Sequence, residues 1–337
     1  MTSSKQYFML FANCIPINGF SESILLDLQR GGYLPIPNLL YKVLDFNATI
    51  KSITEVKKKF NNEFDTGIDK YYSFLEKEEY GFFTNEPLLF PKLNSEFRSP
   101  FKIISSVISI TENSTYNLEN LLGQLIDLGC QLVQIRIFNK FDLIKLKKIV
   151  QIFKDSRVNT VEVYLKDFHY SDTDLKSLME NDMRINVIVH SSLKNNDINL
   201  SKGGGRKVRF IKDKINENQK EKYAKELFIS NTKFYLESKN YNAGLYRKVC
   251  VDSDGNIKNY LSHDYVYGNL LSEQIKDIID TDVFKEKWSL NNDKIEKCKD
   301  CQFRYSCLSN SDIKEVDSQY YKVDDCNFNP YENSWDN

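Results

Sequence analysis

Apolar and polar residues alternate over the first part of the chain in a way that predicts strands followed by helices. Residues 5–17 and 23–29 are rich in β-branched and other apolar residues, and Asn18-Gly19 supplies a turn between them. Apolar residues then recur at helical spacing. This spacing predicts helices that begin near Asn38, at 52–61 and at 66–79, and a short strand follows at 81–84. A sheet followed by three helices and a wing strand is a winged-helix arrangement.

The second predicted helix carries a local start signal. Ser52 precedes it and Glu55 follows three positions later, which is the spacing of a capping box. We therefore expect the helix to begin immediately after Ser52.

The pattern changes after a linker at 86–100, which is punctuated by three prolines. Buried-type strands now alternate with amphipathic helices, which is typical of βαβ units and a parallel sheet. The expected strands are 103–110, 131–138, 159–165 and 184–190, and the expected helices are 117–129, 142–155 and 172–181. Four such strands amount to half of an eight-stranded barrel, so we expect a partial (β/α) barrel.

The last hundred residues are richer in Asn, Asp, Tyr and Cys. The stretch RKVCVDSDGNIKNYL predicts a hairpin with Asp254-Gly255 at its turn, and a short helix is expected at 272–286. Together these patterns predict an α/β protein with three domains, at 1–95, 100–235 and 240–337.

Composition narrows the setting of the protein. The 337 residues carry a formal net charge of −1, so no basic field exists to hold nucleic acid or an anionic membrane surface. No apolar run approaches the ~20 residues of a membrane span, and the first residues lack the features of a secretory signal. We therefore expect a cytoplasmic protein with reduced thiols. Its seven cysteines then favour metal ligation or free thiols over disulfides.

Four of those cysteines have the spacing of a metal site. Cys298, Cys301, Cys307 and Cys326 form the pattern C-x2-C-x5-C-x18-C. Four thiolates suit Zn²⁺ and a [4Fe–4S] cluster alike, and the alternative is a set of reduced, unligated surface thiols. A site with every position filled by cysteine leaves no place for a substrate, so it is structural or electron-transferring.

The residues around these cysteines resemble a known module. KCKDCQFRYSC, followed by CNFNPYENSW, resembles the SPASM domain, the auxiliary-cluster module of peptide-modifying radical SAM proteins. With FANCIPINGFSESILLDLQR and VIVHSS, the whole chain resembles the SPASM-domain peptide maturases of grasp-with-spasm systems. The resemblance implies two partners, the leader of a ribosomally made precursor peptide and an ATP-grasp ligase. The sequence leaves a homodimer open.

The chain departs from that family at two cofactor sites. A SPASM domain typically holds two clusters, and the resemblance places the first cluster's ligands at Gly244, Tyr260 and Ser311, none of which is a cysteine. The first barrel strand ends as VISITENSTYNLEN, without the C-x3-C-x2-C motif of radical SAM enzymes. The resemblance therefore implies a degenerate, pseudo-radical-SAM protein that does not use S-adenosylmethionine.

The N-terminal layout is similar to the RiPP recognition element, a winged-helix module to which a leader peptide adds as an extra strand. Leu26, Leu28, Tyr71 and Phe74 are the candidate leader contacts. The expected function is that of a non-catalytic maturation partner whose four-cysteine site staples the fold.

Three alternatives remain open. One is electron transfer through a single [4Fe–4S] cluster, and another is a radical SAM enzyme with a displaced motif. The third is a peptide-modifying enzyme that uses the barrel cleft for non-radical chemistry. Its candidate residues are His190, Glu162, Arg136 and Arg184.

Overall fold

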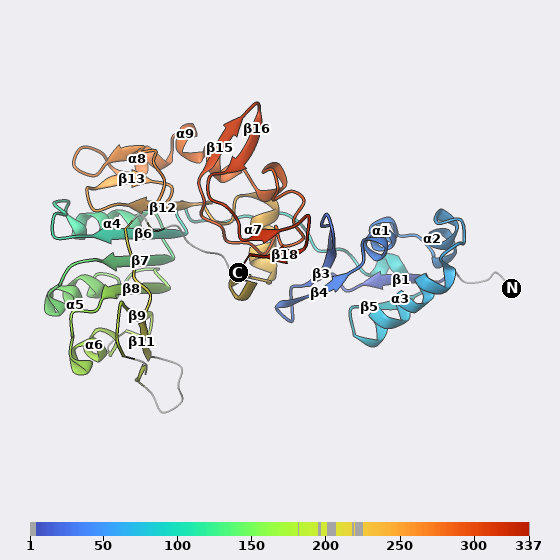
Figure 1. Cartoon of the computed structure of the whole chain (residues 1–337), viewed down its shortest axis with the longest axis horizontal. Coiled ribbons are helices and arrows are strands. Elements are labelled where there is room, and N and C mark those ends of the chain that lie inside the picture. Colours follow the sequence, from blue (N-terminus) through green and yellow to red (C-terminus); the bar gives the residue numbers. More distant parts are fainter. Residues whose placement is uncertain are drawn as a thin grey trace.

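The computed structural model describes residues 5–180, 182–194, 197–200, 207–217, 219 and 225–336. Its N-terminal unit, at the right of Figure 1, contains five strands and three helices. They are β1 (Tyr7–Leu10), β2 (Cys14–Ile17), β3 (Ser23–Asp27), β4 (Gly32–Ile36), α1 (Asn38–Asn47), α2 (Ile53–Lys59), α3 (Asp65–Lys77) and β5 (Gly81–Thr84). β1 pairs with β5, while β2, β3 and β4 form a separate antiparallel sheet.

The sequence pattern predicted one strand over 5–17, and this was wrong. A turn at 11–13 divides it, and the Cys14 N–H donates to the Phe11 carbonyl at 2.9 Å. The start of α2 was predicted correctly. Ser52 Oγ accepts from the Glu55 N–H at 3.3 Å, and the Glu55 carboxylate accepts from the Ser52 N–H at 3.0 Å.

The central region is a large sheet with helices, at the left of Figure 1. The predicted alternation is confirmed by β6 (Ser105–Ile110), α4 (Leu118–Asp127), β7 (Leu132–Ile137), α5 (Leu143–Gln151), β8 (Thr160–Lys166), α6 (Asp172–Met179) and β9 (Ile185–His190). One parallel strand, β11 (Lys207–Ile211) beside β9, was missed. β12 (Lys248–Val251) was predicted as an arm of a hairpin, but its parallel pairing with β6 was not. The described sheet therefore has six parallel strands and not four.

Short antiparallel strands extend both edges of this sheet. β10 (Ile198–Asn199) pairs with β11, and β13 (Asn256–Lys258) pairs with β12 and with β14 (Gly268–Asn269). The hairpin predicted around Asp254-Gly255 is therefore present between β12 and β13. Because β12 also pairs with β6, the central sheet continues past residue 240.

The C-terminal segment contains the helices α7 (Thr232–Asn240), α8 (Ile275–Ile279) and α9 (Asp282–Lys285) and the hairpins β15 (Ile313–Val316) with β16 (Gln319–Lys322) and β17 (Phe328–Asn329) with β18 (Ser334–Trp335). In Figure 1, α7 and the β15–β16 and β17–β18 hairpins of the C-terminal segment lie between the central sheet and the N-terminal unit, whereas α8 lies above β13 and α4. Single 3-10 turns occur at Pro87–Leu89, Lys225–Leu227, Glu286–Ser289 and Asn292–Lys294.

Three apolar clusters hold the elements together. One joins the central sheet to its helices, and another lies under α1 to α3 in the N-terminal unit. In the third, Ile24 and Leu26 of β3 pack against Phe303 and Phe328 of the C-terminal segment. The sheet β2–β3–β4 is thus fixed to residues nearly three hundred positions away. No helix among the described residues is both long and apolar enough to cross a membrane.

Candidate functional site

The four predicted metal ligands line one cavity of about 530 Å³. Cys298, Cys301 and Cys307 lie on the loop that follows the 3-10 turn at Asn292–Lys294. The hairpin β15–β16 then reverses the chain, and Cys326 follows it. A bridge between Ile295 and Tyr320 holds the loop beside the hairpin. Cys326 thereby lies at the same cavity as Cys298, Cys301 and Cys307.

Local backbone contacts fix the C-x2-C turn. The Cys301 N–H donates to the Cys298 carbonyl at 3.1 Å, and the Phe303 N–H donates to Cys301 Sγ at 3.4 Å. Lys297 Nζ donates to the Cys326 carbonyl at 3.3 Å, so the two ends of the site are tied together. The Phe303 N–H favours a thiolate at Cys301, because it donates to that sulfur.

Burial dominates the electrostatics of these thiols. It raises the pKa of Cys298 to about 11, and it raises the pKa of Cys301 and Cys307 above the ordinary cysteine value. The neighbouring cysteines raise the pKa of Cys298 further, whereas Lys322 and Lys297 lower it. The basic residues therefore lie where they would offset the charge of a multi-thiolate complex.

The donor set suits a thiophilic metal or cluster, because four cysteines line one cavity. However, no three or more His, Cys, Asp or Glu side chains in the described ranges form a group that could hold a metal ion. The four thiols line one cavity, but they do not form a group that could coordinate a single metal ion. The metal site therefore stays a prediction.

The three residues that the resemblance assigns to the first SPASM cluster make other contacts in the structure. Gly244 packs against Ser309, with the Ser309 carbonyl carbon 2.7 Å from the place where a Cβ would lie. The Tyr260 hydroxyl accepts from Arg136, and Ser311 Oγ accepts from the Asp324 N–H at 2.9 Å. A side chain at Gly244 would need backbone movement.

Three of the four candidates for non-radical chemistry lie on one face of the central sheet. Gln134 connects two of them: its amide nitrogen donates to the Glu162 carboxylate at 2.7 Å, and its oxygen accepts from Arg136 Nε at 2.6 Å. His190 ends β9, its ring lies 5.1 Å from that of Tyr164, and burial lowers its pKa. These side chains alternate with the buried residues that face the helices.

Arg184 does not belong with them. It lies just before β9, at the opposite end of that strand from His190. Its guanidinium bonds the Asp182 carboxylate at 2.6 Å and the carbonyls of Lys154 and Val158. Arg184 therefore ties loops together at the amino ends of the strands, where sites are rarely found in parallel sheets.

A residue that the sequence pattern did not reveal lies at the carboxyl ends of the strands. The Glu217 carboxylate accepts from Ser109 Oγ at 2.5 Å, from the Ser253 N–H at 2.7 Å and from Ser253 Oγ at 2.9 Å. It lines a cavity of about 620 Å³ with the residues that follow β6 and β7. No periodicity or motif surrounds Glu217, so the sequence carried no signal for it.

The four candidate leader contacts do not form one surface. Leu26 and Leu28 are buried in the cluster that contains Phe303 and Phe328. Phe74 is exposed on α3, and Tyr71 packs against the other N-terminal cluster. A peptide on the outer surface of this structure has no access to the two leucines.

Comparison with known proteins gives little further definition. No protein-family model matches the chain, and no curated protein matches it. Among solved structures, Streptococcus suis SuiB bound to S-adenosylmethionine aligns with 13% identity and a TM-score of 0.32. The alignment covers 89% of this chain and 94% of that one. A TM-score this low assigns neither fold nor activity. The structure by itself defines the class: a mixed α/β protein with a large, mainly parallel sheet.

Proposed function

We propose that this chain is a non-catalytic cytoplasmic partner in the maturation of a ribosomally made peptide. It binds the leader of the precursor peptide and an ATP-grasp ligase, and a four-cysteine metal site staples its C-terminal segment. The observation that carries the proposal is the gathering of Cys298, Cys301, Cys307 and Cys326 at one cavity. In contrast, the loop at 111–117 that follows β6 contains no cysteine.

The position of the cavity supports a structural role for the metal. Phe303 lies between Cys301 and Cys307, and Phe328 lies two residues after Cys326. Both aromatic rings pack against the N-terminal sheet. A bound Zn²⁺ would cross-link this segment, and a [4Fe–4S] cluster would add one-electron transfer. The chain itself supplies Phe303 and Phe328, which form the apolar surface against which β3 packs.

The alternative is a peptide-modifying enzyme of non-radical chemistry. The row formed by Arg136, Glu162 and His190 on one sheet face favours it. Against it, the Arg136 and Glu162 side chains already bond to Gln134, and Arg136 also bonds to Tyr260. Arginine also does not release its proton in proteins, so Arg136 cannot act as the acid or base of such a reaction.

Titration of the purified chain with the synthetic leader of a candidate precursor peptide tests the proposal. We expect saturable binding, an additional complex when the ATP-grasp ligase is added, and no change in the mass of the full precursor. Absence of leader binding, both with and without the ligase, contradicts the proposal. A mass change produced by this chain alone favours the enzyme instead.

A further inference from the structure

Two adjoining cavities lie where the linker before β6, the start of β12 and the chain around α9 meet. Their volumes are about 230 and 280 Å³, and Arg247, Lys285 and Trp288 line both of them. Residues 99–102 of the linker line the first cavity, and Tyr246 lines the second. Among the described lining residues, none belongs to the cysteine cavity. Ligand sites often form at such junctions between separate units of a chain.

Aromatic rings form one wall of these cavities. The Tyr241 ring stacks on the Tyr246 ring, with ring centres 3.8 Å apart and planes at 9°. The Tyr246 ring meets the Trp288 ring at an angle of 76°, with centres 5.9 Å apart. Burial raises the pKa of Tyr246 to about 12, so its phenol carries no charge. Three rings held in this way offer a planar ligand a preformed apolar surface.

Trp288 carries a buried donor that lacks an acceptor. The residue is 7% exposed, and among the described residues no group accepts from its indole Nε1–H. Buried tryptophan N–H groups normally have an acceptor, because an unpaired buried donor destabilises the fold. Since Trp288 lines both cavities, its free donor favours a ligand that supplies an oxygen acceptor.

Arg247, which lines the same two cavities, is held in a fixed orientation. Its Nε donates to the Tyr246 hydroxyl at 2.8 Å, and its Nη1 donates to the Ser99 carbonyl at 2.9 Å and to the Phe101 carbonyl. Its backbone φ of 51° lies in the left-handed region, and such strain is characteristic of functional positions. Among the described residues Nη2 has no acceptor, so the guanidinium retains a donor for a ligand oxygen.

The charge of the lining is positive. Lys102, Arg247 and Lys285 are its cations, and Asp280 is the single carboxylate among the described lining residues, which leaves a net charge of +2. Asp280 accepts from Lys102 Nζ at 2.7 Å and from Lys285 Nζ at 3.4 Å, and these three side chains are 41–58% exposed. Exposed ion pairs contribute little, so little stability is lost when the two lysines turn to an incoming anion. The lining therefore favours an anionic ligand.

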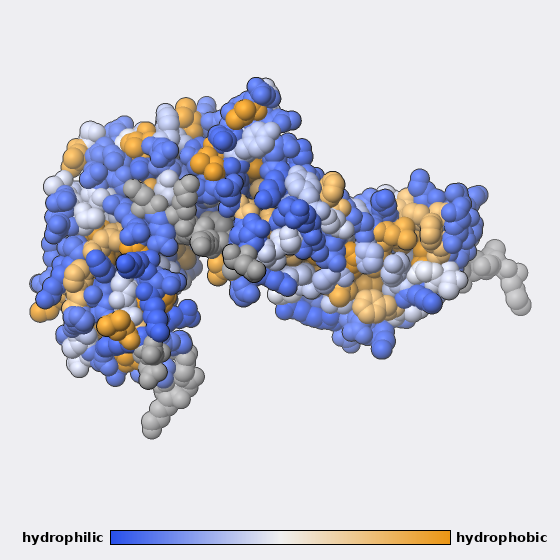
Figure 2. All heavy atoms as spheres, in the orientation of Figure 1, coloured by the Kyte–Doolittle hydropathy of each residue, from blue (hydrophilic) through white to orange (hydrophobic). Residues whose placement is uncertain are grey.

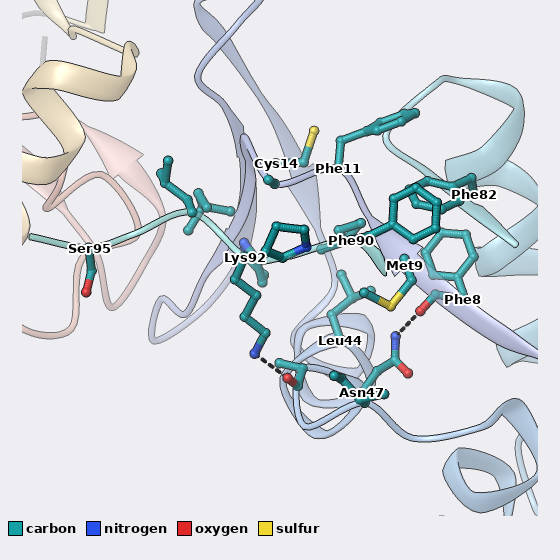
Figure 3. Close-up of a pocket in the computed structure, with 18 of the residues that line it drawn as sticks. Phe8, Met9, Phe11, Cys14, Leu44, Asn47, Phe82, Phe90, Lys92 and Ser95 are labelled. Atoms are coloured by element: carbon teal, nitrogen blue, oxygen red, sulfur yellow. Dashed lines mark hydrogen bonds between the residues drawn. The ribbon is translucent and has the colours of Figure 1, made fainter. Parts of the chain in front are cut away.

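A cavity of about 400 Å³ in the N-terminal unit provides a contrast (Figure 3). Lys92 is the single charged side chain among its described lining residues, and its Nζ already donates to the Ala48 carbonyl. Asn47 Nδ2 donates to the Phe8 carbonyl at 2.6 Å. Apolar residues also interrupt the hydrophilic surface of this unit (Figure 2). The lysine and amide donors of this cavity are engaged within the protein, whereas the two cavities beside α9 retain donors for a ligand.

We propose that the two cavities beside α9 form a binding site for a small organic anion, in which a carboxylate or phosphate is attached to an aromatic or other planar body. The oxyanion accepts from Trp288 Nε1 and Arg247 Nη2. Lys102 and Lys285 supply further positive charge, and the planar body rests on the Tyr246 ring. This site is separate from the cysteine cavity and depends on neither leader nor ligase binding, so it goes beyond the proposed function.

The chain has two tryptophans, so the indole signals of Trp288 and Trp335 in a proton–nitrogen correlation spectrum test the proposal with an internal reference. Trp335→Phe assigns the two signals. Phenyl phosphate and benzoate are titrated separately, with benzamide as the neutral comparison. We expect both anions to move the Trp288 signal downfield and to saturate, because its proton becomes hydrogen-bonded. The Trp335 signal should not move, and the tighter of the two anions identifies the oxyanion.

Three results overturn the proposal. One is a Trp288 signal that moves with neither anion, and another is an equal shift with benzamide. The third is an affinity for inorganic phosphate equal to that for phenyl phosphate, because the aromatic wall then contributes nothing.

Calorimetry with variants tests the residues. Trp288→Phe should weaken the tighter anion by about tenfold without lowering the Tm, because phenylalanine keeps a ring and removes the unpaired donor. Lys285→Gln should weaken it severalfold, and Lys276→Gln is the matched control, since Lys276 is exposed on α8 and lines neither cavity. Phe90→Asp, in the wall of the N-terminal cavity, should leave anion binding unchanged. Full affinity in Lys285→Gln, or a loss confined to Phe90→Asp, also overturns the proposal.

Discussion

The phenol of Tyr260 accepts a hydrogen bond from Nη2 of Arg136 at 3.0 Å, and both residues are buried. Lys248 Nζ lies 5.2 Å from the centre of the same ring. Tyr260 therefore lies between two cations that come from β7 and β12. The resemblance had placed a lost cluster ligand at this position, and the structure has a buried polar network there. A buried cation is tolerated only with such partners.

Removal of the Tyr260 hydroxyl tests how much the network contributes. Tyr260→Phe keeps the ring but takes a partner from the Arg136 guanidinium. We expect the free energy of unfolding in urea to fall by about 1–3 kcal/mol, because a buried donor loses its acceptor. Tyr321→Phe is the matched control, since its hydroxyl bonds Gln319 at the surface. Equal stability of the two variants would show that the network adds nothing.

Local signals in the sequence predicted most elements. Ser52 and Glu55 define the start of α2, and the alternation of apolar segments defines β6 to β9 with their helices. β11 and the parallel pairing of β12 were missed for a physical reason: each strand is short, and each pairs with a strand outside its own local segment. β12 pairs with β6, which lies more than a hundred residues earlier, and no local pattern encodes that contact.

The same limit applies to the candidate site. The spacing of the cysteines predicted four residues that do line one cavity. Alternation identified Leu26 as an apolar strand residue but could not reveal that Phe303 covers it. Glu217 receives its hydrogen bonds from Ser109 and Ser253, both distant in the chain, so only the folded structure brings these three together.

Gly244 provides a second stability test. A methyl group there would overlap the Ser309 carbonyl, so Gly244→Ala should destabilise the chain by about 1–3 kcal/mol in urea unfolding. Gly123 is the matched control: it lies in α4 with no atom near its missing Cβ. Gly123→Ala should stabilise by about 0.5–1 kcal/mol, because alanine favours helix. Unchanged stability of Gly244→Ala would contradict this prediction, because it would mean that the backbone at Ser309 moves aside without a measurable cost.

Glu237 predicts a pH dependence of stability. Burial raises the pKa of this α7 carboxyl to about 7, above its unfolded value. The folded state therefore binds more protons between about pH 4.5 and pH 7, and the free energy of unfolding falls as pH rises through that window. Glu237→Gln should gain about 1–3 kcal/mol over the wild type at about pH 8 and little at about pH 5. Glu119→Gln, at an exposed position of α4, should show no such difference. A constant gain at both pH values would contradict the assignment.

Metal content decides the role of the cysteine cavity. We expect freshly purified protein to contain one zinc or about four irons per chain, depending on whether the site holds Zn²⁺ or a [4Fe–4S] cluster. Cys301→Ser or Cys326→Ser should lose most of that metal, because each removes a soft ligand that serine does not replace. Cys14→Ser is the control, since Cys14 is buried in the N-terminal cluster away from the cavity. Metal loss should also lower the Tm, because the site would join the loop at 298–307 to the segment after β16. Elemental analysis with a thermal melt measures both effects, and metal content equal in all variants would place the metal elsewhere.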